Sequence, residues 1–113
     1  MSPLQPSYRE EIENTYLTLY ENFATLYQHC STSVQKKQLS DTHSGARYAL
    51  WKVGPQERPD DSSVGTTVSQ DLKIANMQLN TMLKNLDDID AFLILAAEAV
   101  RLAASLAPPS ADA

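Results

Sequence analysis

The chain is predicted to be all-α, because apolar residues recur at steps of three and four through both halves of its 113 residues. The second half keeps this spacing over residues 67–107, and the first half keeps it from Tyr8 to Cys30. Every proline lies near an end of the chain or between residues 54 and 60, where it interrupts neither stretch. We therefore expect two long antiparallel helices and a short connecting helix, in a bundle that is dimeric.

Residues 67–107 are predicted to form one long helix. Thr67 and Gln70 have the spacing of a capping box at its start, and Pro108 ends it. This helix would be about 60 Å long. That is longer than a compact domain of about 100 residues is wide, since the radius of gyration of such a domain is about 13 Å. The helix is therefore either kinked, or it leaves apolar surface for another chain. The apolar stripe of this helix consists of Val68, Leu72, Ala75, Leu79, Met82, Leu86, Ile89, Leu93, Ala96, Val100, Ala103 and Ala107.

The second part of this helix, residues 91–107, is apolar on two sides, and Glu98 and Arg101 are its only charged residues. A membrane span is not expected, because the run is shorter than about 20 residues and carries both charges near its middle. A helix with two apolar sides is buried on two sides. Its second contact is another chain or the connecting segment folded back, and a monomeric core is the remaining alternative. The residues expected to mediate self-association are Phe92, Leu95, Ala99, Leu102 and Leu106.

The first predicted helix covers residues 7–38. Ser7 and Glu10 have capping-box spacing, and further acidic residues follow in the first turns, where the helix dipole favours them. The pattern leaves the end of this helix open after Cys30. A short helix is expected at residues 41–52, before Gly54 and a mobile linker at residues 54–66. The stripe of the first helix, expected to be core or interface, consists of Tyr8, Ile12, Tyr16, Leu19, Phe23, Leu26 and Cys30, with Tyr20 and Tyr27 on its flank.

The formal net charge of −5 argues against nucleic acid as a direct partner, because phosphate contacts need clustered Lys and Arg. Residues 31–53 are the exception to this acidity. They contain Lys36, Lys37, Arg47 and Lys52 against Asp41 alone. On an acidic protein, such a patch either steers an acidic protein partner or is a solvated face.

No catalytic, cofactor-binding or metal-binding residues are predicted, and we expect no enzyme activity. His29 and Cys30 are neighbours, so on a helix their side chains point about 100° apart and cannot act together. Cys30 is instead expected to be a buried, unreactive thiol. His29, His43 and Asp41 lack a recognised metal-ligand spacing. The acidic cluster at residues 87–90 is expected to be a solvated helix face, and the absence of a signal-peptide pattern favours a cytoplasmic location.

The short helix contains the residues that we expect to bind a partner. Trp, Tyr and Arg are the residue types most enriched at binding hot spots. If this helix covers the two long helices, Trp51 and Leu50 belong to the core. If it projects, they form a recognition element, and the sequence does not separate these two arrangements. The predicted partner-binding residues are Arg47, Tyr48, Leu50, Trp51 and Lys52.

Three features give the whole chain a resemblance to a known family. These are the opening MSPLQP, the WKVGP junction at residues 51–55, and the Ala-rich terminal helix. With these features the chain resembles the QslA-like family of small anti-activators of bacterial quorum sensing. The resemblance implies a dimeric helical module without a cofactor. It implies that the module binds the ligand-binding domain of a LuxR-type transcriptional activator and blocks its dimerisation and DNA binding.

A second class of function is compatible with the same sequence. A helical module of this size also suits other protein-binding roles, such as a secretion chaperone or a toxin-immunity protein. The two classes differ in the partner, which the residues do not name.

Overall fold

The computed structural model describes residues 8–53 and 63–106, and these residues form five helices and no strand. The prediction of an all-α chain is therefore confirmed for the described residues. None of these helices is long and apolar enough to cross a membrane. The helices are α1 (Tyr8–Glu21), α2 (Phe23–His29), α3 (Ser33–Val53), α4 (Ser63–Leu83) and α5 (Ile89–Leu106).

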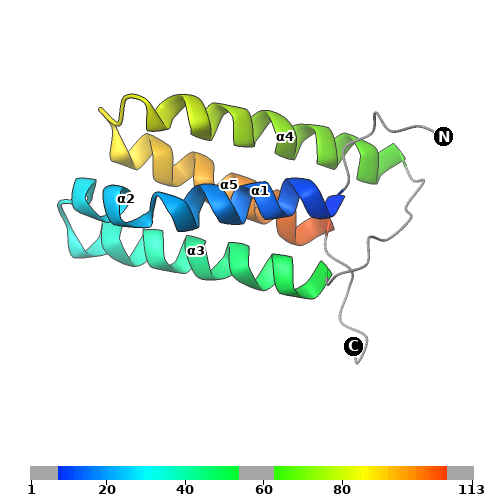
Figure 1. The fold of residues 1–113 in the computed structure, drawn as a ribbon, viewed down its shortest axis with the longest axis horizontal. Coiled ribbons are helices and arrows are strands. Elements are labelled where there is room, and N and C mark those ends of the chain that lie inside the picture. Colours follow the sequence, from blue (N-terminus) through cyan, green and yellow to red (C-terminus); the bar gives the residue numbers. More distant parts are fainter. Residues whose placement is uncertain (1–7, 54–62, 107–113) are drawn as a thin grey trace.

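The helices form a four-helix bundle, in which α2 continues α1 along one edge (Figure 1). Two antiparallel hairpins make up the bundle, one from α1, α2 and α3 and the other from α4 and α5. The hairpins stack so that α1 packs against α4 and α3 packs against α5. Both of these pairs run in the same direction in Figure 1. The described fold measures 45 × 32 × 20 Å.

The prediction of one helix over residues 67–107 is wrong, because a turn after Leu83 divides it into α4 and α5. Asn85, Asp87 and Asp88 favour turns, since their side chains compete for backbone hydrogen bonds. Asp88 then caps α5, where its Oδ1 accepts a hydrogen bond of 3.1 Å from the Ala91 amide. The acidic cluster is therefore a helix start and not the solvated middle of a helix.

The turn explains why α5 is apolar on two sides. It folds α4 back along α5, and α3 covers the other side of α5. Both contacts that the sequence demanded are thus made within the same chain. The residues of α5 that are buried in this way are Phe92, Leu93, Ala96, Ala99, Ala103 and Leu106.

The first predicted helix, residues 7–38, is likewise divided. At Asn22 the backbone leaves the helical conformation (φ −110°, ψ 11°), and the side-chain Nδ2 of Asn22 donates to the Thr18 carbonyl at 2.8 Å. A capping box then starts α3: the Gln35 amide donates to Thr32 Oγ1 at 3.0 Å, and Gln35 Oε1 accepts from the Thr32 amide at 3.2 Å. The predicted short helix at 41–52 is therefore the second half of the 21-residue α3.

Two further expectations concern the ends of these helices. Residues 63–66, assigned to the linker, form the first turn of α4, so the helix begins before Thr67. Residues 54–62, and Ser7 at the predicted start of the first helix, lie outside the described residues.

Gly45 lies within α3 and faces α5, since a Cβ placed on it would lie 2.9 Å from Val100 Cγ1.

Candidate functional site

The five residues predicted to bind a partner lie in the last two turns of α3, but they do not all face outward. The side chain of Trp51 is 74% exposed and that of Tyr48 is 57% exposed, and Arg47 is exposed as well. Lys52 is half-buried, and Leu50 is half-buried and packs against the core. Trp51 therefore projects from the bundle whereas Leu50 packs against the core, so neither of the two arrangements that the sequence left open holds for both residues.

The two exposed aromatic rings of α3 hold one another in place. The rings of Tyr48 and Trp51 stack with their centres 6.0 Å apart and their planes 29° apart. The Lys52 ammonium lies 5.5 Å from the centre of the Tyr48 ring, on the next turn of the helix. Side chains that are ordered before a partner arrives lose less conformational entropy on binding. The pair is therefore suited to act as a preformed contact.

A second aromatic cluster joins α1 and α2 to α3 around His43. The His43 ring lies 5.5 Å from Tyr16, 6.2 Å from Tyr20 and 5.3 Å from Phe23, measured between ring centres. Its Nε2 is buried and has no hydrogen-bond partner among the described residues. Burial lowers the pKa of His43 below its usual value of 6.5, and the positive charge of Arg47 lowers it further. His43 is therefore neutral at neutral pH.

The two aromatic clusters belong to one surface. His43, Arg47 and Trp51 follow one another at intervals of four residues, which places them on the same side of α3. Beside them, Lys36 lies 5.2 Å from the centre of the Tyr27 ring on α2. We call this surface the aromatic face, and its exposed or half-buried residues are Tyr20, Tyr27, Lys36, His43, Arg47, Tyr48 and Trp51.

Sequence reasoning found only part of the aromatic face. The positions of Tyr20 and Tyr27 on the flank of the first helix were visible in the heptad pattern. Their proximity to α3 was not, because it depends on how the first hairpin closes. The division of helix 7–38 at Thr32 was the missing step, since only then does α3 run back beside α1.

The part of the aromatic face that α3 contributes is electropositive, although the chain as a whole is acidic. Asp41 is the only carboxylate on α3, and its Oδ2 pairs with the Lys37 ammonium at 2.7 Å. Arg47 forms no ion pair within the part of the chain that the structure describes. The basic residues recognised in the sequence therefore all lie on α3, with Lys37 and Arg47 exposed and Lys36 and Lys52 half-buried.

Most of the residues predicted to mediate self-association are buried in the protein's own core. Phe92 and Ala99 are completely buried, and Leu106 is 8% exposed. Leu95 and Leu102 are half-buried at the edge of the core. The first three are thus not available to a second copy of this fold, because α3 and α4 already cover α5.

An open apolar groove of about 490 Å³ lies between α4 and α5 and includes one of the two remaining residues. No charged side chain lines this groove. Exposed Ile74 and Met77 form part of its wall. The full lining is Ile74, Met77, Gln78, Thr81, Met82 and Leu95.

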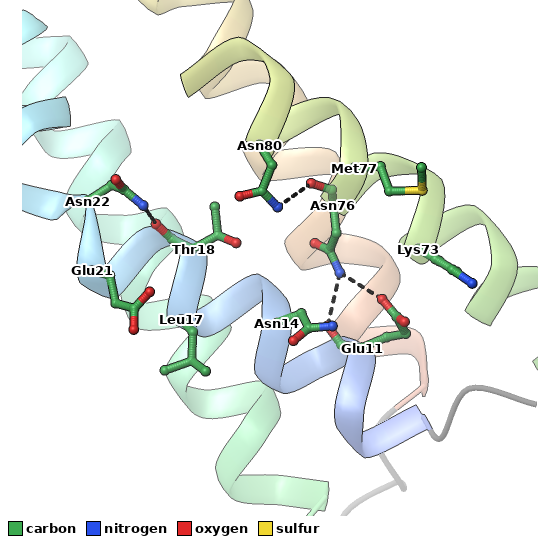
Figure 2. Close-up of a pocket in the computed structure, with 10 residues that line it drawn as sticks. All are labelled: Glu11, Asn14, Leu17, Thr18, Glu21, Asn22, Lys73, Asn76, Met77 and Asn80. Atoms are coloured by element: carbon green, nitrogen blue, oxygen red, sulfur yellow. Dashed lines mark hydrogen bonds between the residues drawn. The ribbon is translucent and has the colours of Figure 1, made fainter. Parts of the chain in front are cut away.

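A polar cleft of about 360 Å³ lies between α4 and α1 (Figure 2), and Met77 lines both this cleft and the apolar groove. Beneath it, Asn76 joins the two helices. Its Nδ2 donates to the carbonyl oxygen and to Oε1 of Glu11, at 3.1 Å each, and its Oδ1 lies 2.7 Å from the hydroxyl of Thr15. Figure 2 shows the first two of these bonds running from α4 to α1. Since Glu11, Thr15 and Asn76 are all buried, this network fixes how α1 and α4 align.

The groups with catalytic chemistry are apart or inactive in this fold. Cys30 is buried between α2 and α3, and this burial raises the pKa of its thiol, with Asp90 adding to the rise and Lys36 opposing it. The prediction of a buried thiol is confirmed, and the protonated form is a poor nucleophile. His29 is exposed, with its Nδ1 2.9 Å from the Thr25 carbonyl on its own helix. Within residues 8–53 and 63–106, no three His, Cys, Asp or Glu side chains are grouped as a metal site would require.

Comparison with protein families, with curated proteins and with solved structures finds no match to this chain.

Proposed function

We propose that the protein is a bacterial anti-activator that binds the ligand-binding domain of a LuxR-type transcription factor and blocks its dimerisation and DNA binding. The observation that carries the proposal is the exposed, stacked pair of Tyr48 and Trp51 beside Arg47. The choice of a LuxR-type partner comes from the family resemblance of the sequence. We propose that the protein acts in the cytoplasm, without catalysis or a cofactor.

The aromatic pair supports a binding role on energetic grounds. Burial of a large aromatic side chain is one of the largest favourable contributions that a single residue makes to stability or binding. In this fold Trp51 leaves most of that surface in water. Trp, Tyr and Arg together dominate the hot spots of protein interfaces. Burial of Trp51 against a partner therefore contributes a favourable free energy to binding, because folding alone leaves most of the indole in water.

The proposed mechanism is competition for a protein surface. An inhibitor that works by occupying a dimerisation surface is consumed as it binds, one molecule for each site that it blocks. Inhibition should therefore follow the molar ratio of the protein to the activator, by mass action. A catalytic inhibitor would act at much smaller amounts.

The test is a titration of the protein into a complex between a LuxR-type activator and its operator DNA, followed by gel shift. We expect loss of the complex at roughly one or two molecules of the protein per activator. Trp51→Ala should raise the required concentration by about tenfold or more, as expected for a hot spot. Ile94→Ala is the matched control, because Ile94 is an equally exposed apolar residue on α5. Loss of the complex at substoichiometric amounts would refute the mechanism.

The identity of the partner needs a separate test, because the gel shift presupposes it. The protein, immobilised through its C-terminus, should retain a LuxR-type regulator from the cytosol of its source cell, and Trp51→Ala should not. Retention of a secreted effector or a toxin in the same Trp51-dependent way would instead assign the protein to the chaperone or immunity class.

Homodimerisation remains a proposal, now with a different surface. We propose that a second copy packs on the groove between α4 and α5, where Leu95 adjoins Met77 and Ile74. An uncharged surface suits a two-fold interface, since each patch meets its own copy without like-charge repulsion. Light scattering should show a dimer at micromolar concentration for the wild type and a monomer for Met77→Glu. A monomeric wild type would exclude this assembly.

A further inference from the structure

We infer that the partner presents a carboxylate beside an apolar slot, and that Arg47 binds the carboxylate while Trp51 fills the slot. This inference rests on the proposed function only in taking the aromatic face as the binding surface. It adds the chemistry of the partner: an acidic protein segment with an apolar recess, whatever the larger protein to which that segment belongs.

The cations of α3, which give the aromatic face its positive charge, are not equivalent. Lys37 is already paired with Asp41. Lys36 and Lys52 lie over the rings of Tyr27 and Tyr48. Arg47 is exposed and makes neither an ion pair nor a ring contact with the described residues. It is therefore the cation of this face that is available to a partner.

Arg47 lies next to a cluster of aromatic rings. The elements α1 and α2, which pack against α3, contribute the uncharged rings of Tyr16, Tyr20 and Phe23, and His43 between them is neutral. These rings supply no negative charge, and no carboxylate of α1 forms an ion pair with the guanidinium within the described residues. A carboxylate from outside the chain meets Arg47 without first having to displace an internal partner.

Arg47 and Trp51 lie close together on α3. The two residues are four positions apart on α3, so their side chains are neighbours on one helix side. An arginine binds a carboxylate through two parallel hydrogen bonds, which fixes orientation as well as charge. A single partner segment must therefore offer a carboxylate to the guanidinium and, next to it, an apolar recess to the indole.

A nucleic acid would offer phosphates and base rings to the same pair of groups, but the rest of the chain disfavours it. The net charge is −5, and Glu10, Glu13 and Glu21 are exposed or half-buried on α1, which lies next to α3. A nucleic acid that extended beyond the aromatic face would meet these carboxylates. An acidic protein segment of limited length avoids them.

Trp51 allows a direct test, because it is the only tryptophan in the chain and its fluorescence reports its own burial. The probes are two Trp-free helical-hairpin peptides with the same leucine-lined groove between their helices, one with Glu and the other with Lys at the positions that flank the groove. A short DNA duplex is the third probe. We expect the Glu peptide to shift the Trp51 emission to shorter wavelength and to bind about tenfold more tightly than the Lys peptide. This preference should decrease as salt is added.

Three variants locate the charge that is responsible. Arg47→Glu should abolish the preference for the Glu peptide. Arg47→Lys keeps the charge but loses the paired hydrogen bonds, and should weaken binding several-fold. Lys84→Glu makes the same charge change at an exposed residue after α4, and should bind like the wild type. Far-ultraviolet circular dichroism should be the same for all three, because each side chain is exposed.

The inference is overturned if the Lys peptide or the DNA duplex is the better ligand, or if no probe shifts the emission. It is also overturned if Lys84→Glu weakens binding as much as Arg47→Glu, because the effect would then come from net charge. These outcomes are separable from failure of the proposed function, since the peptides contain no activator sequence. A positive peptide result with no activator binding would retain the acidic partner and reject the LuxR-type one.

Discussion

Gly45 occupies a position in α3 where the neighbouring helix leaves little room. A Cβ at this residue would lie 2.9 Å from Cγ1 of Val100, a β-branched side chain with little rotational freedom. Gly45→Ala would gain about 1 kcal/mol of helix propensity but lose about 1–3 kcal/mol through overpacking. We expect a net loss of about 1 kcal/mol in the free energy of unfolding, measured by urea denaturation.

A double-mutant cycle tests the cause of that loss. Val100→Ala removes the atom that Gly45→Ala would meet, so the double variant should be more stable than the sum of the two single changes predicts. Additive effects would show that the two helices separate freely at this point. The sequence marked Gly45 only as an unfavourable residue within a helix, because nothing local reveals the approach of α5.

His43 gives the bundle a dependence on pH. The burial that lowers its pKa acts only in the folded state, so the unfolded chain binds more protons at pH values below about 6.5. The free energy of unfolding should therefore fall as pH decreases through 6.5, and stop falling below the pKa of the folded state. The groups around the imidazole are the rings of Tyr16, Tyr20 and Phe23 and the cation of Arg47.

The control for this prediction is His43→Phe, which keeps an aromatic ring between the same neighbours and removes the buried Nε2. Chemical denaturation at pH 7.5, 6.5 and about 5.5 should show a smaller loss for His43→Phe than for the wild type. Equal pH profiles would mean that His43 is solvated in the folded protein. The comparison also subtracts every contribution to the pH dependence that the two proteins share.

At the scale of elements, helix ends decide this fold more than helix interiors do. Asp88 caps α5 through the Ala91 amide, so Asp88→Ala should lower the free energy of unfolding by about 1 kcal/mol. Asp87→Ala is the matched control, because it removes the same charge from the exposed neighbouring residue. Denaturant titration measures both. Equal effects would show that net charge, not the cap, is responsible.

The same helix ends explain which elements the sequence predicted and which it did not. The heptad pattern correctly identified helical residues on both sides of Leu86, but it ran through the turn, because α4 and α5 each direct the same stripe to the core. Thr32 and Gln35 had the capping-box spacing that starts α3, and Asp88 had the chemistry of a cap. The prediction of uninterrupted helices followed the apolar periodicity and not these two caps. A turn of five residues nevertheless costs little conformational entropy and brings two apolar stripes together.

At the scale of the whole molecule, Cys30 reports whether the bundle is closed. Its thiol is buried at the turn between α2 and α3 and is protonated at neutral pH, so alkylation of the native protein should be slow. Addition of guanidinium chloride should raise the alkylation rate to that of a free thiol. A native rate that already equals the denatured one would show that the α2–α3 turn opens readily.

The whole fold was predictable in class but not in topology. An all-helical chain with acidic ends and a basic middle followed from the residues alone. The arrangement of two stacked hairpins did not, because it depends on two turns that the apolar pattern conceals. For the candidate site, Arg47, Tyr48 and Trp51 were predictable by residue type. Their exposure was not, since that depends on which side of α3 meets α5.

The buried join between α1 and α4 has a consequence for the order of folding events. Each hairpin forms through neighbouring stretches of chain, whereas the bonds of Asn76 to Thr15 and Glu11 span 61 and 65 residues. Contacts between distant residues form late, after the local ones have reduced the entropy of the chain. Asn76→Ala, which leaves Glu11 buried without its amide, should therefore accelerate unfolding far more than it slows refolding in stopped-flow kinetics. The lifetime of the native state would then depend on the hydrogen bonds that Asn76 makes across the two hairpins.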